Sequence, residues 1–275
     1  MILALDIDGT LTNSQKCISP ATKAALRHMM ERGHKVILAS GRPSTGIRRY
    51  ERELELEKHG GYVLAFNGAC ITRCETGEII YKKVLPGDLL PGLYRFAKEK
   101  GCGLATHKGD ISVSAFAPDE YVELEARING MTVVQPEDFV GYVDFDMHKC
   151  LMTAEPSKAA ALEIQLRERY GDRADIYRSD PYFIEVMPQG VDKGAALGKL
   201  LAIIGAGWED TVCCGDGYND ISMIRQAAVG VAMANAQPEV RAAADYVAPG
   251  NDEDGLVQVI NRYILQEAVM RINGK

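Results

Sequence analysis

Short apolar runs alternate with longer amphipathic segments at both ends of the chain. Three such runs lie before residue 67, at Met1–Leu5, Lys35–Ala39 and Tyr62–Phe66. A short continuous apolar run is typical of a strand buried in a parallel sheet. Between the runs, apolar residues recur at the three- to four-residue spacing of a helix. The alternation therefore predicts an α/β fold with a Rossmann-like parallel sheet core and helices on both faces.

Residues that start and stop helices mark the segments between these runs. Ser19 and Pro20 suit the N-cap and the first turn of a helix, and Gly33 suits its end. Pro43 predicts the start of a second helix, which we expect to continue towards Gly60.

The pattern changes after residue 69. Cys70–Thr72 and Glu78–Tyr81 flank Thr76-Gly77 and predict a hairpin. Beyond it we expect helices near Leu89–Lys100, Pro118–Ile128 and Ser157–Tyr170, and strands near Leu104–His107, Asp110–Ser114, Lys149–Ala154, Asp175–Arg178 and Phe183–Met187. This mixture predicts an α+β module inserted between two parts of the parallel sheet.

The first pattern resumes at Gly190. We expect helices at Asp192–Gly205, Ile221–Ala227, Pro238–Ala244 and Gly255–Ile272, and strands at Asp210–Cys214, Val229–Met233 and Tyr246–Val247. Residues 1–82 and 190–275 are therefore expected to form one core domain, and residues 83–189 an inserted domain.

Two carboxylates directly follow the first apolar run. Asp6 and Asp8 are two residues apart, and side chains at that spacing in an extended chain point the same way. Gly9 allows a sharp turn, and Thr10 adds a hydroxyl. Since open α/β sheets bind ligands at the carboxyl ends of their strands, these residues form a candidate site. An Asp-rich turn without further function is the alternative.

More polar groups are expected at the same edge of the sheet. Ser40 follows the second strand, Lys193 begins a helix, and Asp216, Asn219 and Asp220 follow a later strand. A carboxylate-rich edge with one lysine and one hydroxyl suits Mg²⁺ together with a phosphate. Taken singly, Ser40 could belong to a turn, Lys193 could be an exposed helix residue, and the acidic loop could be an ordinary polar loop.

Composition narrows the classes of partner. The 275 residues carry a formal net charge of −7, which argues against a nucleic-acid-binding surface. No apolar run reaches membrane-spanning length and no signal peptide precedes Asp6, so we expect a cytoplasmic protein without a membrane partner. The seven cysteines are expected to be reduced, and a zinc site at Cys70 and Cys74 is an alternative for two of them.

Four segments together resemble the motifs of the haloacid dehalogenase superfamily. They are Asp6-Ile7-Asp8-Gly9-Thr10-Leu11, Ser40-Gly41-Arg42-Pro43, Lys193-Gly194 and Gly215-Asp216-Gly217-Tyr218-Asn219-Asp220. Asn67-Gly68-Ala69, Pro188–Gly194 and Asn251–Gly255 resemble the Cof-type branch, class IIB, of sugar-phosphate and related phosphatases. The resemblance covers nearly the whole chain and implies a catalytic core with residues 83–189 as its C2B-type cap.

The resemblance implies a Mg²⁺-dependent phosphatase that acts on small phosphorylated metabolites, chiefly sugar phosphates, through an aspartyl-phosphate. Asp6 would be the nucleophile, and Asp8 the general acid and then the base. The other implied roles are phosphate binding by Thr10, Ser40, Lys193 and Asn219, metal binding by Asp6, Asp8 (through its backbone carbonyl) and Asp216, and support by Gly41, Arg42, Asn67 and Asp220.

Two other functions remain alternatives to this interpretation. A hexose phosphomutase shares the first motif and moves a phosphate between two positions of a sugar. A non-catalytic sensor would bind a sugar phosphate without turning it over. Release of free phosphate excludes the first alternative, and turnover of a simple aryl phosphate excludes the second. The sequence assigns neither a particular substrate nor an oligomeric state.

Overall fold

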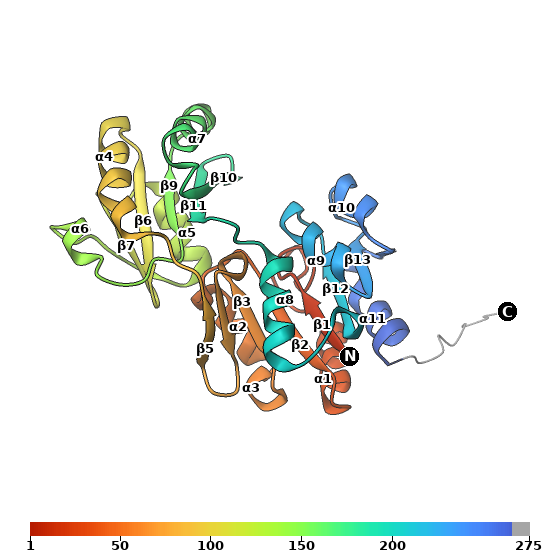
Figure 1. The fold of residues 1–275 in the computed structure, drawn as a ribbon. Coiled ribbons are helices and arrows are strands. Elements are labelled where there is room, and N and C mark those ends of the chain that lie inside the picture. The colour runs from red at the N-terminus through yellow and green to blue at the C-terminus, as the bar shows by residue number, and fades with distance from the viewer. Residues whose placement is uncertain (266–275) are drawn as a thin grey trace. The chain divides into compact units, whose positions relative to one another are not determined.

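The computed structural model describes residues 1–265, and the chain divides into two compact units (Figure 1). The first unit comprises Met1–Gly41, Arg49–Tyr81 and the chain from Asp192 onwards. The second unit comprises Arg42–Arg48 and Lys82–Val191. The expected α/β core with an inserted α+β part is confirmed. The expected domain bounds, 1–82 with 190–275 and 83–189, stay a prediction, and they do not anticipate that residues 42–48 group with the second unit.

The first unit is built on an eight-stranded sheet with the order β14-β13-β12-β1-β2-β3-β4-β5. The strands from β14 to β3 run parallel, and β4 is antiparallel to β3. Their bounds are β1 (Ile2–Leu5), β2 (Lys35–Ala39), β3 (Tyr62–Ala65), β4 (Cys70–Arg73), β5 (Glu78–Lys82), β12 (Thr211–Gly215), β13 (Val229–Met233) and β14 (Tyr246–Ala248). The expected hairpin is formed by β4 and β5, which are neighbours in the sheet.

Strand β1 lies where the order of the strands reverses. The chain adds β2 and β3 on one side of it and later adds β12, β13 and β14 on the other. Leu5, the last residue of β1, is in register with Leu38 of β2 and Cys214 of β12. Because these strands end together, the residues that follow them meet at one edge of the sheet, where open α/β sheets bind ligands.

Helices cover both faces of this sheet (Figure 1). The helices along this part of the chain are α1 (Pro20–Glu31), α2 (Ser44–Glu53), α3 (Leu56–His59), α8 (Lys193–Ile204), α9 (Ile221–Gln226), α10 (Pro238–Ala243) and α11 (Gly255–Val259). Helices α8 and α9 contact each other, and Leu197 of α8 joins Ala4 of β1 in a buried cluster. Leu3 and Leu5 point to the opposite face and are fully buried, while α1 contacts β2 and α11. The sheet is thus apolar on both sides.

The second unit contains a six-stranded sheet with the order β10-β11-β9-β6-β7-β8. Its pairs are antiparallel except for β7 with β8. Its elements are β6 (Gly103–Lys108), β7 (Ile111–Ser114), β8 (Thr132–Val134), β9 (Cys150–Thr153), β10 (Ala174–Asp180), β11 (Phe183–Pro188), α4 (Leu90–Lys100), α5 (Glu120–Asn129), α6 (Phe139–Tyr142) and α7 (Pro156–Tyr170). Leu93 of α4, Leu166 of α7 and Leu104 of β6 belong to one buried cluster, the core of this unit.

The single helix expected between Pro43 and Gly60 is wrong, because the structure has two. Helices α2 and α3 are separated at Glu55, which has a left-handed backbone with φ 53°. Leu54 and Leu56 are both buried, yet residues two apart lie on nearly opposite sides of a continuous helix. The break lets both leucines turn inwards.

Strand β8 and helix α6 are absent from our expectations because three- and four-residue elements are too short to show a period. Within residues 1–265 the structure also has five 3₁₀ turns, at Phe66–Gly68, Gly87–Leu89, Trp208–Asp210, Tyr218–Asp220 and Asn251–Glu253. The helix expected over Gly255–Ile272 begins as α11 and continues as a π-helical segment, Ile260–Ile264. Its residues beyond 265 lie outside the described residues.

All seven cysteines are free thiols, as expected, and only Cys17 is exposed. Cys213 and Cys214 are adjacent in β12, and Cys102 and Cys150 lie in the core of the second unit. No described helix is long and apolar enough to cross a membrane.

Candidate active site

The turn after β1 holds Asp6 in the interior of the first unit. Asp6 donates its backbone N–H to the carbonyl of Cys214 in the neighbouring strand β12 (3.0 Å). Leu11 donates to the carbonyl of Asp6 (3.2 Å), and Thr12 donates to the carbonyl of Ile7 (2.9 Å). These bonds fix the backbone of the turn, so the buried carboxyl of Asp6 has a defined position.

Gly9 allows this turn to approach the acidic loop that follows β12. Its φ is +85°, and a Cβ there would lie 2.3 Å from Oδ2 of Asp216. Thr10 Oγ1 donates to Asp216 Oδ1 (2.9 Å) from the same turn. Asn235 Nδ2 donates to the carbonyl of Gly9 (2.8 Å), a contact that we did not predict. Asn235 follows β13, so its place at the end of a buried strand was the signal that could have found it.

Lys193 is fully buried beside two carboxylates. Its Nζ donates to Oδ1 of Asp6 (2.6 Å) and to Oδ1 of Asp220 (2.6 Å). Lys193 is the first residue of α8, and the N-cap Asp192 accepts from the backbone of Ala195 (2.8 Å). The cap therefore fixes the helix at the residue that carries the ammonium group.

Asp220 organises the acidic loop as well as the lysine. Its Oδ2 accepts from the backbone N–H groups of Asp216 (3.0 Å) and Gly217 (2.9 Å), while its Oδ1 accepts from Lys193. Both oxygens of this fully buried carboxylate are therefore engaged in holding neighbours. The structure thus brings together Asp6, Lys193, Asp216 and Asp220.

A second group of predicted residues lies where β2 and β3 end. Ser40 is buried, and its backbone carbonyl accepts from the N–H of Asn67 (2.9 Å). Asn67 has a left-handed backbone, φ 55°, and its Oδ1 accepts from Asn219 Nδ2 (2.9 Å). A Cβ on Gly41 would lie 3.2 Å from that same Oδ1. One backbone bond and one side-chain bond therefore connect residues from three separate strand ends.

The two predicted aspartates lie in different surroundings. Both Asp6 and Asp8 follow the last residue of β1, so the extended geometry that would make them point the same way ends before them. Asp6 is buried with Lys193, whereas Asp8 is about one-third exposed and forms an ion pair with Lys16 (2.9 Å). The difference suits two carboxyls with different chemical tasks.

Arg42 groups with the second unit and not with the acidic residues. Residues 42–48 belong to that unit, and Arg42 Nη1 donates to the carbonyl of Ile128 (3.3 Å). Thr45 Oγ1 similarly donates to the carbonyl of Gly109 (2.8 Å).

The charges at the sheet edge are unbalanced. Burial raises the pKa of Asp6 well above its ordinary value, and Asp220 and Asp216 raise it further, against the effect of Lys193. Burial likewise raises the pKa of Asp216 to about 6. Burial would lower the pKa of Lys193, but Asp220 and Asp6 raise it, so the ammonium stays charged. One lysine is thus surrounded by more negative charge than it neutralises.

These residues fit a hard divalent cation. One carboxylate oxygen each from Asp6, Asp216 and Asp220 lie within 4.8 Å of one another. Mg²⁺ prefers oxygen ligands and is commonly held by one or two carboxylates, leaving positions for water and phosphate. A cation beside Asp6 and Asp216 would also offset the excess negative charge. The side chain of Asp8 is not in this group. We expected Asp8 to contribute only its backbone carbonyl.

Comparison with known proteins gives a consistent result over almost the whole chain. The family model of haloacid dehalogenase-like hydrolases matches residues 3–260. The protein is 30% identical to "Putative phosphatase YxeH" of Bacillus subtilis (strain 168), over 96% of this chain and 98% of that one.

Two solved structures extend the comparison. A haloacid dehalogenase-like hydrolase from Bacteroides thetaiotaomicron is 41% identical with a TM-score of 0.92, covering 95% of this chain and 98% of that one. The subclass IIB sugar phosphatase BT4131 is 28% identical with a TM-score of 0.78, at the same coverage. These matches confirm the resemblance to the Cof-type branch and the expected class of enzyme, a phosphatase. The chain belongs to the haloacid dehalogenase-like hydrolase family.

Proposed function

We propose that this enzyme hydrolyses small phosphorylated metabolites, sugar phosphates foremost, with Mg²⁺ as its cofactor and Asp6 as its nucleophile. The observation that carries the proposal is the contact of the buried Lys193 ammonium with the carboxylates of Asp6 and Asp220, each at 2.6 Å. A buried cation beside a carboxylate at a strand end suits a dianionic phosphoryl group, whose approach to carboxylates requires positive charge. The likeness to a subclass IIB sugar phosphatase supports sugar phosphates as the substrate class.

The proposed first step transfers the phosphoryl group to the protein. A carboxylate oxygen of Asp6 attacks phosphorus, an O–P bond to Asp6 forms, and the ester P–O bond breaks in line with it. The carboxyl of Asp8 gives its proton to the leaving oxygen, so the alcohol departs uncharged. Asp8 is partly exposed and pairs with Lys16, so its surroundings differ from those of the buried Asp6.

The second step regenerates the enzyme. The carboxylate of Asp8 takes a proton from water, and the water oxygen attacks the phosphorus bound to Asp6. The O–P bond to Asp6 breaks, and inorganic phosphate leaves. Lys193 stabilises the charge of the phosphoryl oxygens in both steps, and the side chains of Ser40 and Asn219 are proposed to donate hydrogen bonds to them. Thr10 is proposed to donate through its backbone N–H, because its hydroxyl donates to Asp216.

Asp6, Asp216 and the backbone carbonyl of Asp8 are proposed to hold Mg²⁺. When bound, Mg²⁺ would neutralise negative charge on the phosphoryl oxygens. Asp220 would act as a positioning residue, because its two oxygens hold Lys193 and the backbone of the acidic loop. The cytoplasm remains the expected location.

Replacement of the nucleophile tests the covalent mechanism. Asp6→Asn keeps the volume of the side chain and removes the attacking charge, so we expect turnover to fall by about 10⁴–10⁶-fold. Brief incubation of the wild-type protein with a radiolabelled phosphate ester should leave hydroxylamine-labile label on Asp6. Full activity in Asp6→Asn would contradict the mechanism. Sugar phosphate isomerised without release of phosphate would instead indicate a phosphomutase.

The second unit is proposed to distinguish among leaving groups. The groups at the sheet edge bind the phosphoryl group, which all candidate substrates share, so selection requires other residues. The long segment of this unit, Lys82–Val191, begins after Asn67 and ends before Lys193, both of them predicted site residues. Ser112 and Asn129 each have a buried side-chain oxygen without a hydrogen-bond partner among the described residues. Such atoms are candidates for contacts with a hydroxylated ligand.

Substrate panels test this assignment. In Ser112→Ala and Asn129→Ala we expect kcat/KM to change by different factors for different sugar phosphates and to change much less for a small aryl phosphate. Ser114→Ala is a matched control, because Ser114 Oγ already donates to the carbonyl of Phe116 (2.9 Å). If each variant scales all substrates by one common factor, the selection must be sought in Arg42 and Asn67.

A further inference from the structure

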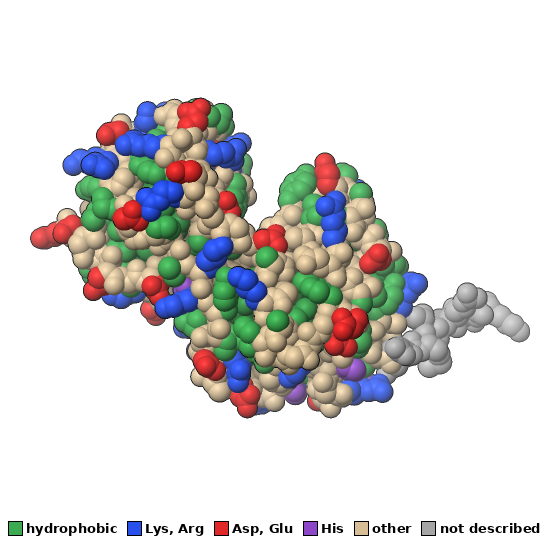
Figure 2. Space-filling model, viewed as in Figure 1, with side chains coloured by type: hydrophobic (Ala, Val, Ile, Leu, Met, Phe, Trp, Pro, Cys, Tyr) green, Lys and Arg blue, Asp and Glu red, His purple; other side chains and the backbone are tan. Residues whose placement is uncertain are grey.

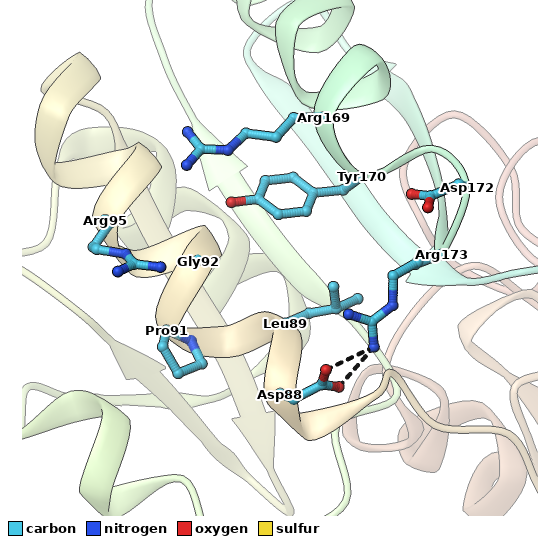
Figure 3. A pocket seen from close by; sticks show the side chains of 9 residues that line it. All are labelled: Asp88, Leu89, Pro91, Gly92, Arg95, Arg169, Tyr170, Asp172 and Arg173. Carbon is cyan, nitrogen blue, oxygen red and sulfur yellow. Dashed lines mark hydrogen bonds and ion pairs between the residues drawn. The ribbon is translucent and has the colours of Figure 1, made fainter.

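A pocket of about 340 Å³ in the second unit gathers positive side chains (Figure 3). It lies between the first half of α4, the end of α7 and the turn after α7. Figure 2 shows several Lys and Arg side chains over these helices. The lining contains three arginines, Arg95, Arg169 and Arg173, two aspartates, Asp88 and Asp172, and the ring of Tyr170. This concentration contrasts with the net charge of −7 of the whole chain.

One of the three arginines is neutralised within the protein. Arg173 Nη2 contacts both carboxylate oxygens of Asp88, at 2.7 and 2.8 Å. By contrast, neither Arg95 nor Arg169 forms an ion pair with any carboxylate among residues 1–265, and Arg169 lies over the ring of Tyr170 at 5.5 Å. The pocket therefore offers two guanidinium groups whose charge is not offset by a contacting acid.

Tyr170 adds a neutral donor to the same space. Its ring packs against the core of the second unit, and a Cβ on Gly92 would lie only 2.7 Å from its hydroxyl. Gly92 thus leaves the room that the hydroxyl occupies. Figure 3 shows the Tyr170 hydroxyl and the Arg169 guanidinium extending from α7 towards α4, which carries Arg95. In the described part of the chain this hydroxyl has no hydrogen-bond partner.

The helix dipole explains only part of this arrangement. Arg169 lies in the last turn of α7, where a positive charge is favourable. Arg95 lies in the middle of α4, where the helix provides no such stabilisation. Two arginines that face one pocket repel each other, and a bound anion would reverse the sign of that interaction.

We propose that this pocket binds a dianionic phosphoryl group, as inorganic phosphate or as a small phosphate ester, through Arg95, Arg169 and Tyr170. Guanidinium groups present paired N–H donors that match phosphate oxygens, and the volume accommodates a phosphate with a small substituent. The residues that line this pocket include none of those proposed for catalysis, so the proposal goes beyond the proposed function and does not depend on it.

Chemical protection of arginines tests the proposal directly. Phenylglyoxal modifies accessible arginines, and peptide mass spectrometry gives the rate at each residue. With inorganic phosphate occupying about nine-tenths of the sites, we expect modification of Arg95 and Arg169 to slow about tenfold. Arg127 is the control, because it is an exposed arginine in the last turn of α5 outside the pocket. Unchanged rates at Arg95 and Arg169 would overturn the proposal.

Variants and a second ligand complete the design. Arg95→Gln should remove the protection of Arg169, and Arg169→Gln should remove the protection of Arg95, while Arg127→Gln should affect neither. Circular dichroism of each variant establishes that it is folded, and protection retained in a folded Arg95→Gln would also refute the site. A sugar phosphonate, which cannot be hydrolysed, forms the other arm. Protection at lower concentration by the phosphonate or by inorganic phosphate identifies which form of the anion the site prefers.

Discussion

Each unit of this protein buries one lysine between two carboxylates, but the two clusters differ in charge. In the first unit, Lys193 lies 2.6 Å from both Asp6 and Asp220. In the second unit, Lys149 lies 3.5 Å from Glu125 and 3.1 Å from Glu185. Lysine side chains are rarely this deeply buried, so both clusters require explanation.

The pKa shifts of the acids separate the two clusters. In the second unit burial opposes ionisation, yet His107 and Lys149 lower the pKa of Glu125 to about 2. His107 Nε2 lies 3.1 Å from Glu125, so this cluster contains a second basic group. In the first unit burial raises the pKa of Asp6, and a third carboxylate, Asp216, adds to the rise. We call the first cluster unbalanced, because it has three carboxylates and one basic group, and the second balanced, because it has two of each.

The largest expected difference between the two clusters is in the activity that remains when each lysine is replaced. In Lys193→Met we expect kcat/KM for an aryl phosphate to fall by about 10²–10³-fold, because one donor to the phosphoryl group is lost. In Lys149→Met we expect turnover to stay within about tenfold of the wild type, since this lysine belongs to the balanced cluster. Steady-state kinetics on both variants decides the comparison. Equal losses of activity in the two variants would contradict the different roles assigned to Lys193 and Lys149.

Stability should respond in the opposite order in the same pair of variants. Lys149→Met leaves two carboxylates buried without their lysine, which costs about 3–5 kcal/mol in the free energy of unfolding. The destabilisation of Lys193→Met should be smaller with Mg²⁺ than without it, because the cation can replace the lost charge. Chemical denaturation with and without Mg²⁺ measures both. A Mg²⁺ effect of the same size in Lys149→Met would contradict the assignment.

The metal requirement sharpens the comparison within the first unit. Chelation should abolish activity, and Mg²⁺ should restore it. Asp216→Ala should raise the Mg²⁺ concentration for half-maximal activity by at least about tenfold, because a proposed ligand is lost. Glu31→Ala, an exposed acid on α1, serves as the control. Activity that is indifferent to the chelator would show that the acidic edge works without a cation.

The smallest expected effect is on the dependence of stability on pH. The folded pKa of Glu125 is lower than its ordinary 4.5, so its contribution is complete above about pH 4.5 and is lost as pH falls towards about 2. Asp6 behaves oppositely. Its folded pKa is raised, so without Mg²⁺ its ionisation costs stability as pH rises above its ordinary 3.8.

Denaturation at several pH values measures both contributions. Glu125→Gln should flatten the acid side of the profile, and Asp6→Asn should reduce the loss of stability with rising pH that we expect in the absence of Mg²⁺. An unchanged acid side in Glu125→Gln would show that another group is responsible.

Most of the fold could be predicted from the sequence, because the strands of the first unit are short continuous apolar runs. Lys35–Ala39 and Val229–Met233 have the bounds that this pattern indicates. The break at Glu55 was missed, because it depends on the burial of Leu54 and Leu56, and the pattern alone is compatible with one helix. Local sequence therefore indicated which elements form, while packing decided where one of them divides.

The candidate site was less accessible to sequence reasoning than the fold. The pattern gave the strand ends, but it did not show that Asp220 uses both oxygens internally or that Asp8 pairs with Lys16. Lysine at a helix start is ordinarily exposed, so the burial of Lys193 required the tertiary structure. Asn235 carries no motif, and its role appears only in its bonds to the carbonyl of Gly9 and to the backbone N–H of Asn251.

The buried thiols allow the rate of opening of each unit to be measured. Burial raises the pKa of Cys213 in the first unit and of Cys150 in the second to about 12, so an alkylating reagent meets almost no thiolate while the chain is folded. Cys17 is exposed and should be alkylated at once. The delay before Cys213 or Cys150 reacts therefore measures how often its own sheet opens, in the natural protein and without any introduced label. The opening rates of the unit with the unbalanced cluster and of the unit with the balanced cluster can thus be compared in one sample.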